Sequence, residues 1–382
     1  MNSDKIVKKF KELFKEEPLL IRSPGRINLI GEHTDYNDGF VFPAAIDKEI
    51  HFAVAKNKEE MFRFFALDLR ESFEMKIADL SKTDTSWANY LLGVAAQYKK
   101  AGYELSGIDC VFGGDIPLGA GLSSSAAIEN GFAFALKEIL EAPVSKIQMI
   151  KMAQKAEHEY AGVMCGIMDQ FASMTGKKDH AIKLDCRSLD YEYADIDLKD
   201  YGILLCNTNV KHELASSEYN TRRKECETGV RLLQQYDKQI KALRDVSLEL
   251  LEEHQNEFEP IVYKRCEFVV KENLRVEKAF SALAKNNIKA LGALMYKSHE
   301  GLRDDYDVSC KELDLLFDMA KKSEDVVGAR MMGGGFGGCT INIVKKEKMN
   351  SFSEDIMREY YKITEIKPEI YTVNITDGTG LV

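Results

Sequence analysis

An apolar strand, a glycine- and serine-rich loop and a helix follow one another without interruption between residues 107 and 140. The loop, Pro117–Ser125, contains Gly119 and Gly121, which allow the backbone to approach a ligand closely. A helix that begins in such a loop directs unpaired backbone N–H groups and the positive end of its dipole toward a bound anion. The segment therefore predicts a phosphate site. The alternative is an ordinary helix start in which the Ser123 hydroxyl caps the helix.

This loop matches neither of the common nucleotide-binding patterns. It lacks the Gly-Lys-Ser/Thr end of a Walker loop, and it does not fit the Gly-x-Gly-x-x-Gly pattern of dinucleotide folds. A phosphate bound here would instead meet serine hydroxyls, which can donate to phosphate oxygens or bind a metal ion.

Charge and composition exclude several classes of protein. The 382 residues include 52 Lys and Arg against 62 Asp and Glu, a net charge of −10 that argues against nucleic-acid binding. A hydrophobic share of 45% is that of an ordinary folded protein. The eight cysteines have no metal-binding spacing, and no apolar segment is long enough to span a membrane. We therefore expect a cytoplasmic protein with free thiols and no membrane contact.

The order of patterns along the chain indicates two domains. Short segments of strand character precede residue 70, and helices are expected at 87–100 and 145–160. From 215 to 322 the chain consists of long, charged, amphipathic helices, after which it returns to strands around a glycine loop. These patterns predict an α/β or α+β protein with packed domains at 1–178 and 179–382.

An acidic cluster lies near the N-terminus, in the glycine-punctuated segment Ser23–Gly39. Glu32 and Asp35 can accept hydrogen bonds from the hydroxyls of a polyol, and His33 can donate one. Arg26 can neutralise charge on a transferring phosphoryl group. The set suits a ligand that combines a sugar and a phosphate. The alternative is a polar turn without a binding role.

Two further acids are candidates for chemistry. Glu157 ends a helical stretch, and Asp169 follows a loop in an otherwise apolar run. An acid at the position of Asp169 can be a general base, although an acid beside a helix start is more often a cap.

The glycine run Gly333–Gly338 lies between two predicted strands that are too apolar to flank a flexible linker. So many glycines predict a backbone that closes over a ligand, with a plain turn as the alternative. Trp87 and Tyr90 lie on an amphipathic helix, for which core packing is the default interpretation.

Taken together and in this order, the three glycine-bearing segments resemble the GHMP small-molecule kinase family. The family's second motif, Pro-x3-Gly-Leu-x-Ser-Ser, matches Pro117–Ser125. Within the family, the run Gly-Arg-Ile-Asn-Leu-Ile-Gly-Glu-His-Thr-Asp-Tyr at residues 25–36 resembles the signature of the galactokinases. Similar stretches continue along the chain at 166–170, 185–188, 217–223, 298–305 and 333–339, so the resemblance covers essentially everything from about residue 20 onward.

The resemblance implies roles for the matching residues. Asp169 would accept the proton of the anomeric hydroxyl, and Arg26 would keep that carboxylate ionised and screen the phosphoryl group. The residues that would bind the sugar are Glu32, His33, Asp35, Gly166, Tyr219, Gly334 and Gly335. Those that would bind ATP are Gly119, Gly121, Leu122, Ser123, Ser124, Ser125, Trp87 and Tyr90. Ser125 and Glu157 would support Mg²⁺, which prefers oxygen ligands.

The implied reaction is direct, in-line transfer of the ATP γ-phosphoryl group to the anomeric hydroxyl of α-D-galactose. Its products are galactose 1-phosphate and ADP, as in the Leloir pathway of galactose metabolism. The implied fold is α+β, with an N-terminal mixed-sheet domain that contains a left-handed βαβ crossover and a ferredoxin-like C-terminal domain. Galactose and ATP would be the partners of a monomer, with an oligomer left open.

Two other interpretations remain. A kinase of the same fold could act on N-acetylgalactosamine, arabinose or glucuronic acid, although Glu32 and Asp35 would repel the carboxylate of an acidic sugar. A catalytically silent sensor of galactose and ATP would also carry the family resemblance. Sensors of this kind differ around the serine loop, whereas Ser123–Ala127 and Asp169 are intact here.

Overall fold

Two long antiparallel strands, β1 (Leu19–Asn28) and β3 (Pro43–Asn57), form the framework of the N-terminal half of the computed structural model. The structure describes residues 3–117, 119–211 and 215–382. The two strands belong to a six-stranded sheet of order β13-β1-β3-β6-β4-β5. Its other members are β4 (Met61–Ala66), β5 (Glu71–Lys76), β6 (Gly107–Gly114) and β13 (Gly380–Leu381). Strands β4 and β6 run parallel, and the chain passes between them through β5 and α2 (Ser86–Lys100), so the sheet is mixed and contains a crossover.

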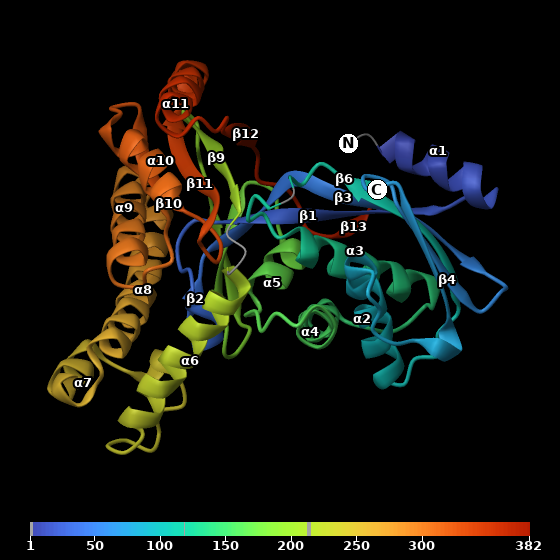
Figure 1. Cartoon of the computed structure of the whole chain (residues 1–382), viewed down its shortest axis with the longest axis horizontal. Coiled ribbons are helices and arrows are strands. Elements are labelled where there is room, and N and C mark those ends of the chain that lie inside the picture. The colour runs from blue at the N-terminus through green and yellow to red at the C-terminus, as the bar shows by residue number, and fades with distance from the viewer. Residues whose placement is uncertain (1–2, 118, 212–214) are drawn as a thin grey trace.

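Helices cover both faces of this sheet. Successive side chains of a strand point to opposite faces, and apolar side chains on each face pack against helices. Ala53 and Val111 point to the face that α1 (Ser3–Phe14) covers with Ile6 and Phe10. The opposite face carries the main hydrophobic core and packs directly against α3 (Ser124–Ile139) and α5 (Met168–Thr175), and α2 and α4 (Lys146–Ala156) pack in turn against α3 (Figure 1). Since α3 and α5 both lie against β1, the serine loop and Asp169 lie beside the N-terminal acidic segment.

The C-terminal half is built around a four-stranded antiparallel sheet of order β10-β11-β9-β12. Its strands are β9 (Tyr201–Lys211), β10 (Val326–Met331), β11 (Gly337–Lys345) and β12 (Glu369–Val373). The helices that pack against it are α9 (Ile288–Asp304), α10 (Lys311–Lys322) and α11 (Met349–Thr364). The strand order and the helical connections between β9 and β10 and between β11 and β12 are those of a ferredoxin-like domain.

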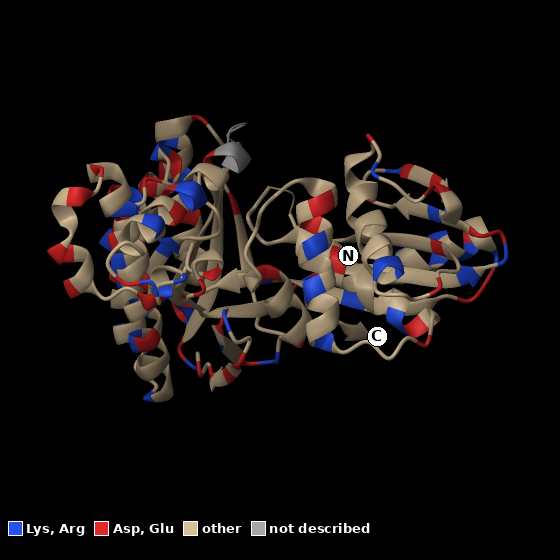
Figure 2. Cartoon of the chain, turned by 90° about the horizontal axis from the view of Figure 1, so that it is seen from below, with Lys and Arg blue, Asp and Glu red and all other residues tan. Residues whose placement is uncertain are grey.

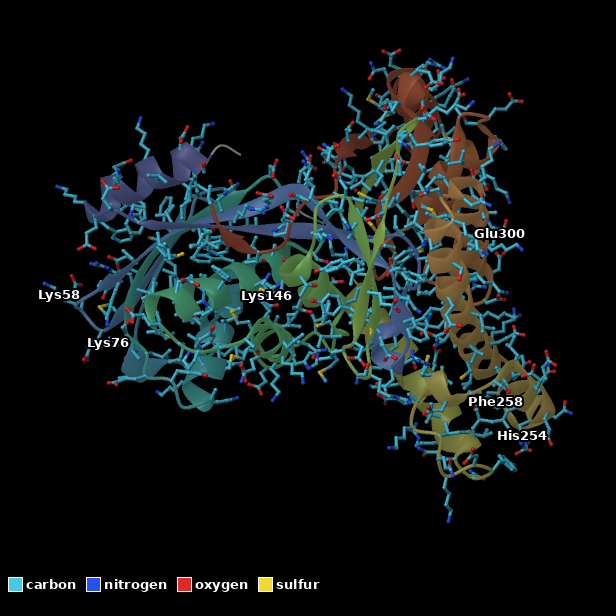
Figure 3. The ribbon with its side chains drawn as sticks, turned by 180° about the vertical axis from the view of Figure 1, so that it is seen from behind. Lys58, Lys76, Lys146, His254, Phe258 and Glu300 are labelled. Carbon is cyan, nitrogen blue, oxygen red and sulfur yellow. The ribbon has the colours of Figure 1, made fainter. Side chains whose placement is uncertain are left out.

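A helical arm extends from this second sheet. It contains α6 (Ala215–Leu233), α7 (Leu248–Glu253) and the long α8 (Pro260–Ala284). His254 and Phe258 lie near the tip of the arm (Figure 3). The arm has a small core of its own, to which α6 contributes Cys226 and α8 contributes Phe268.

A small sheet and several short helices complete the chain. Strands β2 (Phe40–Val41), β7 (His180–Asp185) and β8 (Tyr191–Asp195) form a three-stranded sheet of order β2-β7-β8. The short helices are η1 (Asp35–Asn37), η2 (Ile77–Asp79), the π-helix η3 (Glu157–Ala161), η4 (Leu243–Asp245), η5 (Gln255–Glu257) and η6 (Lys346–Lys348).

The predicted fold class is confirmed: the chain is α+β, with a mixed sheet in its N-terminal half and a ferredoxin-like arrangement in its C-terminal half. The division into domains at residue 178 stays a prediction. Strand β13, at the C-terminal end of the chain, pairs with β1 in the sheet of the N-terminal half, so the C-terminal residues contribute to both halves. Basic and acidic residues are interspersed along the ribbon in both halves of the chain (Figure 2). Within the described residues, no helix is both long and apolar enough to cross a membrane.

Candidate functional site

A cavity of about 290 Å³ lies where the acidic segment, the α4–α5 connection, α6 and the glycine run meet. Most of the residues predicted to bind the sugar or to carry out the chemistry line it. The lining consists of Arg26, Glu32, His33, Asp35, Glu157, Val163, Cys165, Gly166, Met168, Asp169, Tyr219 and Gly333–Gly335. Segments that are more than 300 residues apart in the sequence therefore share one pocket, and several charged side chains line it.

Arg26 on β1 and Asp169 on α5 form the central ion pair of the cavity. The Nε and Nη2 atoms of Arg26 donate to the two carboxylate oxygens of Asp169 at 2.8 and 2.7 Å. Burial disfavours the charge on Arg26, but the carboxylates of Asp169, Glu32 and Asp35 outweigh burial and raise the pKa of the guanidinium. Asp169 lies inside α5, whose N-cap is Ile167, so its interpretation as a helix cap is wrong.

The serine loop turns toward the same pair. Ser123 has the left-handed backbone conformation (φ 60°), and its hydroxyl donates to Asp169 instead of capping α3. The capping interpretation of Ser123 is therefore wrong. The Nη1 atom of Arg26 donates to the carbonyl of Gly121 at 2.6 Å, and the backbone N–H of Arg26 donates to Leu122 at 3.1 Å. Gly121 itself has φ +73°, which glycine adopts without strain.

Three other carboxyl groups lie close together in the cavity. Burial and the charges of Asp169 and Glu32 raise the pKa of Asp35 to about 7. Burial and the charge of Asp169 also raise the pKa of Glu157 to about 7, although Ser125, Cys165 and Gln170 act to lower it. Burial raises the pKa of Glu32 as well, although Arg330 and Arg26 oppose the shift. Carboxyl groups with raised pKa values can both accept and donate hydrogen bonds, so the cavity is suited to hydroxyl groups, which do the same.

An aromatic cluster closes one side of the cavity. His33 has φ 63°, and its Nδ1 atom lies 2.8 Å from the Tyr36 hydroxyl, which in turn lies 2.7 Å from the hydroxyl of Tyr306. Burial, together with the charges of Arg222 and Arg330, lowers the pKa of His33 to about 3, so the ring is neutral. Tyr219 of α6 packs against His33 with ring centres 5.4 Å apart.

Glycines permit the close approaches around the cavity. A Cβ atom on Gly166 would lie 1.8 Å from a carboxylate oxygen of Asp35, and one on Gly335 (φ +91°) would lie 2.1 Å from the Val308 carbonyl. The N–H of Gly333 donates to Glu32 at 2.9 Å, which ties the glycine run to the acidic segment. Gly334 lies beside the ring of Tyr219.

Ser125 and Glu157 lie close together, and the Ser125 hydroxyl works against the rise in the pKa of the Glu157 carboxyl group. Within the described residues, no group of three His, Cys, Asp or Glu side chains is placed to hold a metal ion. Mg²⁺ is usually bound through one or two carboxylates together with substrate phosphates. One hydroxyl and one carboxyl oxygen donor beside a phosphate loop fit that requirement.

Trp87 and Tyr90 do not line this cavity. Trp87 is largely buried against Phe73 and Phe112, and its indole N–H donates to Glu71 at 2.7 Å. Tyr90 is partly buried, and burial together with the charge of Glu157 raises its pKa to about 12. Their assignment to ATP binding stays a prediction.

Three buried polar residues near the site were not among the predicted ones. Arg330 is fully buried and donates to Glu32 at 3.3 Å. Gln170 donates to Glu157 at 2.6 Å and to the fully buried Glu129 at 3.2 Å. Arg330 interrupts an otherwise apolar stretch, which is the one signal in the sequence that could have indicated it.

Family models match three parts of the chain. They are the galactokinase galactose-binding signature at residues 8–56, the GHMP kinase N-terminal domain at 89–177 and the GHMP kinase C-terminal domain at 279–363. The first match contains the acidic segment, the second contains the serine loop and Asp169, and the third contains the glycine run.

Individual proteins match over nearly the whole length. A galactokinase of Thermosipho africanus is 43% identical over 94% of this chain and 98% of its own length. A galactokinase of Fusobacterium nucleatum is 42% identical over 99% of each chain. The crystal structure of Lactococcus lactis galactokinase complexed with galactose superposes with a TM-score of 0.96 at 34% identity and covers 100% of both chains. Methanococcus jannaschii mevalonate kinase shares the fold alone, with a TM-score of 0.63 at 17% identity over 95% of this chain and 100% of its own.

Proposed function

Because the chain belongs to the galactokinase family of the GHMP kinases, we propose that it transfers the γ-phosphoryl group of ATP to the C1 hydroxyl of galactose. The products are galactose 1-phosphate and ADP. The observation that carries the proposal is the hydrogen-bonded pair of Arg26 and Asp169, which lies in the cavity directly beside the serine loop. A carboxylate and a guanidinium at that junction are what phosphoryl transfer to a hydroxyl requires.

The sugar is bound by cavity residues near the pair of Arg26 and Asp169. Asp35 and Glu32 accept hydrogen bonds from sugar hydroxyls, and the neutral His33 ring fixes the orientation of the sugar. The small surface of Gly166 leaves room beside Asp35, and Tyr219 packs against the sugar from α6. Gly334 and Gly335 approach from the C-terminal half. The support for these roles is that all of these residues line one cavity.

Asp169 accepts the proton of the C1 hydroxyl as the phosphoryl group is transferred. The two hydrogen bonds from Arg26 fix the orientation of the carboxylate and direct it into the cavity. Arg26 also contacts Gly121 of the serine loop, so the same guanidinium lies between the base and the expected phosphate position and can screen the transferring charge. Placement and charge neutralisation supply most of the rate enhancement in reactions of this type.

ATP binds with its phosphates against the serine loop and the N-terminus of α3. The backbone of Gly119–Ser123 and the hydroxyls of Ser124 and Ser125 face the phosphates, and Trp87 and Tyr90 lie toward the base. Ser125 and Glu157 hold Mg²⁺, which neutralises phosphate charge when it is bound. The closeness of the Ser125 hydroxyl, in the first turn of α3, to the Glu157 carboxyl group of η3 supports this assignment.

A sugar panel separates this function from the alternatives. ADP release from Mg-ATP is measured with galactose, glucose, N-acetylgalactosamine and no sugar in parallel. Turnover that requires galactose is the expected result. Turnover with another sugar alone would keep the chemistry and change the substrate, whereas galactose binding without turnover would indicate a sensor.

A further inference from the structure

The loop Asp35–Phe40, which carries the proposed sugar ligand Asp35, is tied to the helical arm by Arg187. The Nε atom of Arg187 donates to Asp38 in this loop at 3.1 Å. Its two terminal nitrogens donate to both carboxylate oxygens of Asp245 in η4 at 2.7 and 2.8 Å. One guanidinium therefore spans two segments that are about 200 residues apart in the sequence.

Arg244, the neighbour of Asp245, contacts the same loop from the arm. Its Nη2 atom donates to Asp185 at 3.1 Å, and its Nη1 atom donates to the carbonyl of Asp38 at 3.4 Å. Its guanidinium also lies over the ring of Phe40 at 3.5 Å from the ring centre, a close cation–π contact. The two arginines thus hold both the side chain and the backbone at the end of the loop.

Backbone pairing completes the attachment. Phe40 pairs with Asp185 between β2 and β7, and the N–H of Cys186 donates to Gly39 at 2.9 Å. The N–H of Phe40 donates to the Asn273 side chain of α8 at 2.9 Å. The end of the loop is consequently fixed by three separate parts of the chain.

The loop has little freedom at its other end, where Asp35 contacts Gly166. A shift of the loop by a fraction of an ångström would move the Asp35 carboxylate relative to the sugar, and binding is sensitive to displacements of this size. We propose that Arg187 and Arg244, held by Asp38, Asp185 and Asp245, form a clamp that positions the loop Asp35–Phe40 for galactose binding. This inference rests on the proposed function, because it assumes that Asp35 binds the sugar.

The clamp lies outside the cavity, so its residues act through the loop and not by touching the sugar. The side chains of Arg187, Asp38 and Asp245 are 38%, 43% and 23% exposed, so salt screens their attraction. Galactose carries no charge, and its own encounter with the protein does not depend on salt. The clamp therefore predicts that galactose affinity falls as the salt concentration rises.

The test compares Arg187→Ala, Arg187→Lys and Asp245→Asn with the wild type. Galactose binding is measured by calorimetry without nucleotide, and KM and kcat are measured with saturating Mg-ATP, each at low and high salt. Arg187→Ala is expected to weaken galactose binding about tenfold, the change produced by roughly 1.4 kcal/mol, with kcat within about twofold of the wild type. Arg187→Lys should restore part of the affinity, since it keeps the charge but loses the two-pronged contact with Asp245.

Arg63→Ala is the matched control. Arg63 forms an equally close pair with Asp109 at 2.6 and 2.7 Å, and its side chain is 24% exposed, but it lies on β4 away from the cavity. It should change thermal stability and leave galactose affinity and its salt dependence unchanged. If Arg187→Ala does not fold, Asp245→Asn serves in its place and should also weaken galactose binding.

Two results would overturn the clamp. One is galactose affinity in the folded Arg187 or Asp245 variants equal to that of the wild type. The other is wild-type affinity that does not respond to salt. Failure of the proposed function would differ from both, because the wild type itself would then neither bind nor phosphorylate galactose.

Discussion

Arg26 meets the carboxylate of Asp169 in a two-pronged hydrogen bond of 2.8 and 2.7 Å and at the same time contacts the Gly121 carbonyl of the serine loop. This arrangement joins the proposed base and the serine loop through one guanidinium, and Ser123 of the same loop also donates to Asp169. The geometry depends on the planar fork of an arginine and not only on its charge. Lysine at this position would supply one point charge to two partners.

Arg26→Lys should therefore reduce kcat about 100-fold while galactose still binds. The reason is that the ammonium group cannot hold both oxygens of Asp169 and screen the phosphoryl group together. Steady-state kinetics with varied galactose measures this change. A raised KM for galactose with an unchanged kcat would instead make Arg26 a binding residue.

Gly166→Ala should raise the KM for galactose by about tenfold or more, with a smaller effect on kcat. The added methyl group would lie 1.8 Å from the Asp35 carboxylate, so that carboxylate has to move. Gly162→Ala is the control from the same connection, because no atom lies within 4 Å of the position of its Cβ, although its φ of +78° disfavours alanine. Equal effects of the two substitutions would show that a general disturbance of this connection, and not the contact with Asp35, is responsible.

Asp35 should make the unliganded protein less stable as the pH rises. Its pKa is about 7 in the folded protein, above the ordinary value of 3.8, so the folded state binds more protons between those two values. Stability from this group is therefore full below about pH 4 and is lost as the pH rises through 7, by at most about 4 kcal/mol.

Asp35→Asn removes this contribution. Its melting temperature should exceed that of the wild type by a few degrees at pH 8, and the difference should shrink toward pH 5. Calorimetry across that range measures the difference, with the exposed Asp79→Asn as a control. A difference between Asp35→Asn and the wild type that does not change with pH would contradict the raised pKa.

Arg330→Met should be strongly destabilising, by about 3–5 kcal/mol, because it removes the ion-pair partner of the buried Glu32 and leaves it only the Gly333 N–H as a hydrogen-bond donor. The double variant Arg330→Met/Glu32→Gln should recover part of that loss, since both charges are then removed together. Thermal unfolding of the single and double variants gives the comparison. Additive losses in the double variant would show that the two side chains are not coupled.

Local motifs indicated much of the site because the chemistry resides in short runs of residues. The serine loop, the acidic segment and the glycine run were each recognisable, and the structure brings all three together. The residues around Asp169 could be assigned only through the family resemblance, since a single acid beside a helix start is otherwise more typical of a cap.

Long-range packing accounts for what the sequence did not indicate. Ser123 turns its hydroxyl to Asp169 because its backbone is left-handed, a conformation that serine rarely adopts. Arg330 donates to Glu32, which lies almost 300 residues earlier in the sequence. Strand β13 has two residues, too few to show the alternating pattern by which a strand is predicted. None of these contacts can be derived from neighbouring residues.

The most direct measurement compares Asp169→Asn with the wild type for galactose 1-phosphate formation in a single turnover with Mg-ATP, beside galactose binding by calorimetry. If Asp169 takes the proton of the C1 hydroxyl, the variant should bind galactose within about tenfold of the wild type and form product at least about 100-fold more slowly. A folded Asp169→Asn that forms product at nearly the wild-type rate would show that the proton goes elsewhere and that the proposed mechanism is wrong.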